Sequence, residues 1–578
     1  MSHKAAVLSM LLLAGCKFGS HREAGKRGDP DQALPRLDSA ETAAIKDPAQ
    51  RARAGWLRYL IASDPRGATR NLELAAQSSS SKDEADRALA LCGLGEIAED
   101  LTDSVTAAKQ FALALRVAPR DPIAELAAVR LLDLEGESPA VDDIIVGAAA
   151  SLQAPMSPRA ARIVREAAAR VESRRAQAAR DPKLELDAWQ KLGTIQHWRV
   201  AGPFAALRLF ELRKPLLLDT EIVQTAATNA RALDFPDGDL GLEQEPGDGD
   251  VFYAASEVTL SQGGEYLLWV EGAAALEARV DGVALLSRVP YPQEVPRAQT
   301  VAVKLAKGKH QVLVRWSRAE GSRFRLTLAR GDGAPADVAS AAPEALTGSR
   351  RPGACALGTS CVAEPAWRDK LNLRDTAEAR LEDDPGDPLA AWLYLRAVLG
   401  DDRAAARAAV DAAVRFSSSG APALALRAQQ LLHDPDMPDR IGRGRALADL
   451  SEAARKDAQL VRARLGASAL LRDSERFDDA ASGLDKAEAT LRDARLAPTA
   501  RTLLARAKLF DSRGNPAGAR ARAAEALLAA PGRCETLDVL FELAHREGSA
   551  SEQQKLAQEM LPCAEGLRTL SQLLRERG

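Results

Sequence analysis

Two long stretches of the chain place apolar residues at the three- and four-residue spacing of amphipathic helices. They cover about 46–192 and 366–578. Between them, over 195–332, the apolar period becomes two, as in 324–328, where every second residue is apolar. The pattern predicts a multidomain α and β fold, in which two α-helical solenoid arrays flank an antiparallel β-sandwich.

Apolar runs separated by turn residues support the sandwich. The runs 265–270 and 311–316 have the composition of buried strands. Asp281-Gly282 and Lys307-Gly308 fall between apolar runs, as the turns of β-hairpins do. Several short antiparallel strands joined in this way are typical of a two-layer sandwich.

The stretch 88–122 carries the clearest pattern for a pair of helices. Large residues are followed by small ones, then by an aromatic residue between two small ones and a closing proline: Leu91, Leu94, Gly95, Ala98, Ala107, Phe111, Ala114 and Pro119. This spacing resembles that of the tetratricopeptide repeat (TPR). Small residues let two antiparallel helices approach closely, large ones fill the gap to the next repeat, and proline ends the second helix.

An internal repeat is visible near the end of the chain. Leu503, Gly514, Ala523 and Leu527 recur 34 residues later as Leu537, Gly548, Ala557 and Leu561, which is the TPR period. Both glycines would lie in the turn between two helices, where a positive φ is easily adopted by glycine. Both helical stretches are therefore expected to be TPR-like.

The N-terminus has the features of an export signal. A short apolar run follows Lys4, too short to span a bilayer, and it ends in Leu-Ala-Gly-Cys at Cys16. This block resembles the bacterial lipobox, which implies cleavage after residue 15 and a lipid on Cys16; the alternative is a buried cysteine after an ordinary signal. In lipoproteins an aspartate after the cysteine implies retention at the inner membrane. Here Lys17 favours the outer membrane, with the lipid as the only contact to the bilayer.

Composition defines the segments between the domains. Residues 16–45 are rich in glycine, proline and charge, which predicts a flexible tether, and 333–365 form a linker of Gly, Ala, Pro and Ser. The formal net charge of -3 gives no electrostatic argument for nucleic acid as a partner.

Five cysteines remain after Cys16, and an odd number cannot pair completely within the chain. Cys92 lies in an apolar helical pattern and is expected to be a small core residue. Cys355–Cys361 and Cys534–Cys563 are candidate disulfides in an oxidising envelope. The spacing of these cysteines is not that of a zinc site, so no metal is expected.

The sandwich opens with Trp-x-Val-x-Gly-Pro-Phe, from Trp198 to Phe204. This opening resembles that of jelly-roll, carbohydrate-binding-like modules of bacterial envelope proteins, and it implies that aromatic residues could contact sugar rings. Trp198, Tyr253 and Tyr291 are the candidates for that contact. The competing interpretation, which we favour, places most of these rings in the sandwich core.

Catalytic motifs are missing from the sequence. It contains no HExxH, Walker loop, GxSxG or GxGxxG, so neither an enzyme nor a cofactor is expected. His545 beside Cys534 and Cys563 could in principle form a nucleophile pair, but a surface histidine is the simpler interpretation. The acidic loop 237–250 could bind calcium, but it lacks an ordered set of ligands and is better explained as a solvated loop.

The sequence therefore predicts a non-catalytic envelope lipoprotein that acts as a protein-interaction scaffold through its repeats. A partner protein would bind the concave surface of the C-terminal array, where Arg506 and Lys508 are the expected contacts. The alternative is a surface glycan-binding protein that uses the sandwich to hold polysaccharide. Some envelope proteins that this chain resembles, with the same helical-sandwich-helical order, continue into a transglutaminase-like half. This sequence does not contain such a half, so a catalytic partner would be a separate chain.

Overall fold

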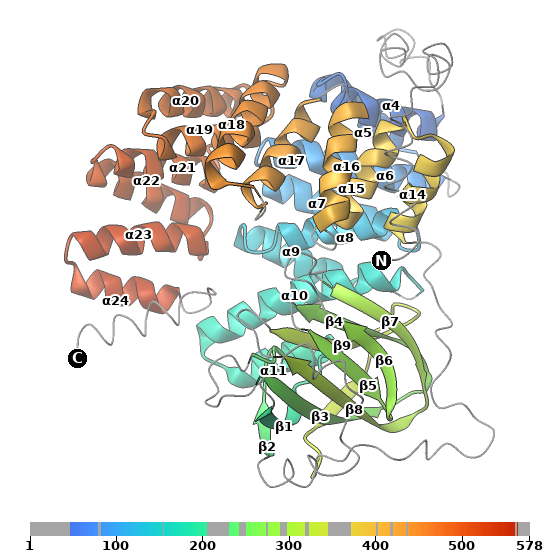
Figure 1. Ribbon diagram of the computed structural model, residues 1–578. Coiled ribbons are helices and arrows are strands. Elements are labelled where there is room, and N and C mark those ends of the chain that lie inside the picture. The colour runs from blue at the N-terminus through green and yellow to red at the C-terminus, as the bar shows by residue number, and fades with distance from the viewer. Residues whose placement is uncertain are drawn as a thin grey trace.

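The structure of the protein is a computed structural model. It describes residues 47–78, 83–153, 155–204, 230–241, 250–272, 275–288, 298–317, 323–344, 372–399, 403–416, 420–434, 437–560 and 563. Cys16, Tyr291, Cys355 and Cys361 lie outside these residues, as do the expected signal and tether. In the described part, a helical region is interrupted by a β-sandwich and then resumes, which confirms the expected fold class (Figure 1).

The N-terminal array consists of antiparallel helices: α4 (Pro48–Leu60), α5 (Pro65–Ala76), α6 (Glu84–Asp100), α7 (Ser104–Val117), α8 (Ile123–Asp133), α9 (Pro139–Ala150), α10 (Pro158–Ala179) and α11 (Pro182–Lys191). Aspartates mark several helix starts. The side chains of Asp47, Asp64 and Asp103 accept hydrogen bonds from backbone amides in the first turns of α4, α5 and α7. Such caps satisfy amide groups that have no partner within the helix.

The pair α6 and α7 has the close packing that the repeat pattern predicts. Phe111 is fully buried between the two helices, with Ala107 and Ala114 one turn before and after it. A Cβ atom on Gly95 would lie 2.6 Å from two atoms of the Phe111 ring. Glycine is therefore required at this position, because any side chain would push the helices apart.

The C-terminal array continues the antiparallel pattern: α14 (Leu373–Asp383), α15 (Pro388–Val398), α16 (Arg403–Phe416), α17 (Ala421–Leu432), α18 (Asp439–Lys456), α19 (Val461–Asp473), α20 (Phe477–Asp493), α21 (Ala500–Ser512), α22 (Pro516–Ala529), α23 (Cys534–Arg546) and α24 (Ala550–Glu559). Gly514 and Gly548 lie in the turns after α21 and α23 and have φ angles of 72° and 70°. The predicted 34-residue repeat is thus confirmed as two successive helix pairs.

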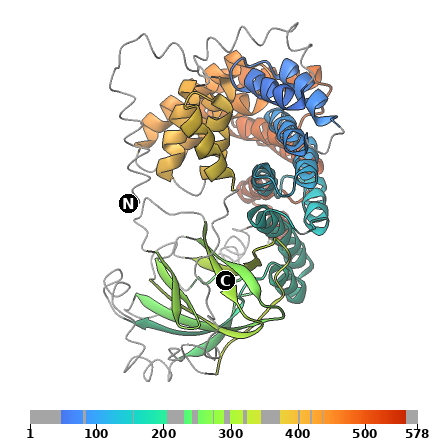
Figure 2. The same cartoon turned by 90° about the vertical axis from the view of Figure 1, so that its right-hand side faces the viewer.

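The two arrays pack directly on each other and share one hydrophobic core. Helices α15 and α17 contact α4, α14 and α15 contact α8, and α19 contacts α6. The sequence order places the sandwich between the arrays, but in space the sandwich lies to one side of the joined helices (Figure 2). The chain leaves the helical region after α11 and returns to it at α14.

The sandwich has two antiparallel layers: β1 (His197–Phe204), β2 (Arg231–Asp234), β3 (Val251–Leu260), β4 (Gly264–Gly272), β5 (Leu276–Val280), β6 (Val283–Arg288), β7 (Ala298–Leu305), β8 (Gly308–Ser317), β9 (Phe324–Arg330) and β10 (Val338–Ala341). One layer has the order β2-β1-β3-β8-β5-β6, with β10 also paired to β3, and the other has the order β7-β4-β9. Trp316 lies between the layers, stacked on Phe252 at 5.4 Å and edge-on to Phe324 at 5.1 Å.

Two predictions about the sandwich turns have different outcomes. Asp281-Gly282 is a hairpin turn between β5 and β6, with φ angles of 49° and 82°. The prediction for Lys307-Gly308 is wrong, because β7 pairs with β4 in the small sheet whereas β8 pairs with β3 and β5 in the large one. This dipeptide carries the chain from one layer to the other.

The sandwich also extends further than its predicted boundary at 332. Strand β10 lies inside the expected linker 333–365, and it pairs with the second half of β3. Val338 is buried in the sandwich core, which explains why this short alanine-rich segment is a strand.

Helix α10 joins the sandwich to the helices. Arg162 of α10 lies 4.7 Å from the centre of the Trp269 ring on β4 and 2.7 Å from the Glu271 carboxylate. Among the helices that the structure describes, none is long and apolar enough to cross a bilayer.

Candidate interaction groove

A buried ionic cluster joins the two arrays. Three acidic residues lie near the end of α6, and the first of them, Glu96, is completely buried. Arg396 of α15 binds Glu96 at 2.5 Å, across a sequence separation of 300 residues. Arg130 of α8 binds Glu96 at 3.1 Å and also pairs with Glu99. A buried charge is tolerated only when it is paired in this way, and this pairing links α6 and α8 to α15 of the other array.

Arg462 of α19 completes the cluster from the other side. It lies 3.1 Å from Glu99 and 2.9 Å from Asp100. Burial opposes ionisation of Glu99, but Arg130 and Arg462 outweigh it and lower the pKa of this carboxyl to about 2. Burial has the greater effect at Asp100 and raises its pKa to about 7, against Arg462 and a 2.7 Å hydrogen bond from the Tyr59 hydroxyl.

A groove opens beside this cluster, between α6 and α8 of the N-terminal array and helices α15, α17, α18, α19 and α21. It encloses about 550 Å³. Its apolar lining includes Leu399, Leu426 and Leu450, and Leu432 is 39% exposed there. An opening of this size with exposed leucine suits a segment of another protein.

The charges of the groove wall are already compensated. Arg130, Arg396, Arg462 and Arg501 line it, and each has a carboxylate partner within the chain. Because these arginines are already paired, they are expected to orient a bound partner and to discriminate between partners, rather than to bind a free anion.

A second set of contacts between the arrays involves Arg501, which lines the groove. Arg501 and Arg533 hold Glu137, in the loop between α8 and α9, at 2.6 and 2.5 Å. The hydroxyls of Thr102 and Thr499 lie 2.9 Å apart. These contacts hold α21 and α23 against the N-terminal array, so the groove has walls from both arrays.

The predicted contact residues Arg506 and Lys508 have partners within the C-terminal array. Arg506 lies 2.7 Å from Asp485 and 2.9 Å from Glu488 of α20, and Lys508 lies 2.6 Å from Glu535 of α23. Neither lines the groove described above. Their role in partner binding stays a prediction, and reversing either charge would also oppose like charges across a helix contact.

The candidate sugar contacts Trp198 and Tyr253 are both buried. Trp198 is completely buried, and its ring N–H donates to the Ile195 carbonyl at 3.0 Å. Tyr253 is 6% exposed and packs against Phe204 at 5.9 Å. The core interpretation is confirmed for Trp198, which packs between the two layers. Tyr253 is buried in a separate small cluster with Val251, Ala255 and Leu313, outside the core between the layers.

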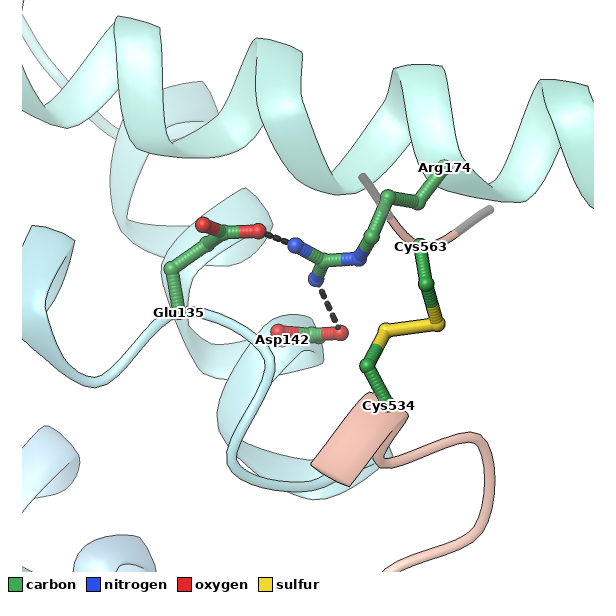
Figure 3. Close-up of a disulfide and its surroundings, with 5 residues drawn as sticks. All are labelled: Glu135, Asp142, Arg174, Cys534 and Cys563. Carbon is green, nitrogen blue, oxygen red and sulfur yellow. Dashed lines mark hydrogen bonds and ion pairs between the residues drawn. A yellow bond between two sulfur atoms is a disulfide. The ribbon is translucent and has the colours of Figure 1, made fainter. Parts of the chain in front are cut away.

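The structure pairs Cys534 with Cys563 in a disulfide, so neither offers a free thiol to His545. Figure 3 shows this bridge near Arg174 of α10, which binds Asp142 at 2.9 Å and also pairs with Glu135. The ring of His545 stacks on Phe541. Cys92 is buried as expected, and burial raises the pKa of its thiol.

Part of the acidic loop 237–250 falls outside the described residues. Among the residues that are described, no group of three or more His, Cys, Asp or Glu side chains could hold a metal ion.

Comparisons with known proteins add little to this geometry. No family model matches the chain. No curated protein matches it. Among solved structures, a similar chain occurs in the crystal structure of the APC/C hetero-tetramer Cut9-Hcn1, at 10% identity and a TM-score of 0.29, over 88% of this chain and 86% of that one. A TM-score this low carries no argument, so the function must be inferred from the groove itself.

Proposed function

We propose that this protein is an envelope lipoprotein that holds a partner protein in the groove between its two helical arrays. The observation that carries the proposal is the groove of about 550 Å³, with leucines along a wall of internally paired arginines. Exposed apolar surface beside ordered charge is typical of protein-binding sites. The contacts of Glu137 with Arg501 and Arg533 support a preformed site, which lowers the entropy cost of binding.

The groove can be tested with a photocrosslinking amino acid at Gln429, an exposed position in its lining. In intact cells this position is expected to give one discrete adduct with a partner protein. Leu432→Asp should reduce that adduct about tenfold or more, because a charge would replace apolar contact in the groove.

The matched control is Leu528→Asp on α22, where the leucine is 82% exposed and does not line the groove. It should leave the adduct unchanged. If both variants crosslink like the parent, or if Gln429 gives only a background of many weak adducts, the groove is not the binding site.

The lipid anchor is proposed from the Leu-Ala-Gly-Cys block, and the outer membrane from Lys17. Cys16→Ser is expected to leave an uncleaved precursor that incorporates no labelled fatty acid, because serine lacks the thiol that accepts the lipid. Labelling in growing cells with membrane fractionation measures both effects, and equal labelling of variant and parent would contradict the proposal.

A further inference from the structure

A second cavity lies where α9, α10 and α11 meet the segment before β10, outside the groove described above. It encloses about 650 Å³. Its walls are largely small and apolar: Val146, Ala149, Ala150, Ala168, Ala169, Ala188, Leu192, Pro335, Ala336 and Val338. This is the size and lining of a site for a small apolar molecule.

One cationic side chain in this cavity has no partner among the described residues. Five arginines of α10 lie within 4 Å of a carboxylate: Arg159, Arg162, Arg170, Arg174 and Arg175. Arg165, on the same helix, lines the cavity. It has no hydrogen bond or ion pair within the residues that the structure describes.

The surroundings of Arg165 do not compensate its charge. Burial lowers the pKa of its guanidinium, and Asp332 opposes this effect only from a distance. The Asp332 carboxylate is itself held by Arg330 at 2.9 Å. The Arg165 side chain is half-buried, but its guanidinium nitrogens are not among the buried polar atoms that lack a partner, so they are accessible to an anion that enters the cavity. An arginine left in this state inside a cavity is explained if a ligand supplies the missing anion.

We propose that this cavity binds a single-chain amphiphile that ends in a carboxylate. The carboxylate would accept two hydrogen bonds from Arg165, and the apolar chain would lie along the alanine-rich wall. The remaining charges select against anions of higher charge. Lys191 is paired with Glu172 at 3.1 Å, and Asp187 and Asp337 also line the cavity.

The probe for this site is cis-parinaric acid, a fatty acid whose fluorescence rises in apolar surroundings. The full chain is expected to bind it saturably, and Arg165→Gln should weaken binding about tenfold or more through loss of a charge-assisted hydrogen bond. Arg175→Gln is the matched control on α10, because Arg175 is exposed and paired with Asp143 at 2.6 Å. This control should bind like the parent.

Further measurements distinguish the contribution of the carboxylate to binding from that of the apolar chain. The methyl ester of the probe should bind the parent and Arg165→Gln equally, and inorganic phosphate should not displace the acid. Ala149→Phe should abolish binding by filling the cavity. The melting temperature of Arg165→Gln should not fall, since an uncompensated charge has been removed, whereas a structural role for Arg165 would lower it.

The inference is wrong if the parent shows no saturable binding, or if Arg165→Gln binds the acid as tightly as the parent does. Either result leaves the proposed function unaffected, because the groove variant at Leu432 and its control at Leu528 lie on other helices.

Discussion

Replacement of Glu96 by alanine is expected to lower the free energy of unfolding by about 3–5 kcal/mol. Glu96 is completely buried and binds both Arg130 and Arg396. Without it, two buried guanidinium groups at the junction of the arrays lose a partner, and neither can reach water without separating the helices. Chemical denaturation followed by helical circular dichroism measures the effect.

The control for this prediction is Glu525→Ala on α22. Glu525 also pairs with an arginine, Arg522, but the two side chains are 48% and 45% exposed. The cost there should be at most about 1 kcal/mol, because water solvates both charges after the change. Equal losses in the two variants would show that the buried cluster does not hold the arrays together.

Phe111→Ala is expected to cost about 3–5 kcal/mol, because it leaves a cavity between α6 and α7. Gly95→Ala should also destabilise the protein, since its new Cβ would lie 2.6 Å from the Phe111 ring. In the double variant the alanine methyl would enter space that the ring has left. Its cost should therefore be smaller than the sum of the two single costs, and the same denaturation measurement gives the coupling.

Gly147→Ala in α9 is the control for the glycine change. Nothing lies within 4 Å of the position where its Cβ would be. This substitution should stabilise the helix by about 0.5–1 kcal/mol, because alanine restricts the unfolded chain. If the free-energy costs of Gly95→Ala and Phe111→Ala were simply additive in the double variant, the two residues would not contact each other as described.

The sequence by itself was sufficient to predict the local elements. Gly514 and Gly548 have the positive φ angles expected of turns between repeat helices, and Asp281-Gly282 forms the expected hairpin turn. These features depend on backbone geometry over a few residues, so a short pattern is enough to specify them. The spacing of Gly95 and Phe111 is equally local, because one turn joins their two helices.

Contacts between distant segments were decided only by the tertiary structure. A pattern read along one helix did not indicate that Glu96 would meet Arg396, 300 residues away. The turn at Lys307-Gly308 has the composition of a hairpin, yet it joins two sheets because the partner strands β4 and β3 lie in different layers. Arginines also recur along α10 without any difference that sets Arg165 apart. Which of them finds a carboxylate depends on the helix or sheet packed against each face, and period and composition carry no information about that packing.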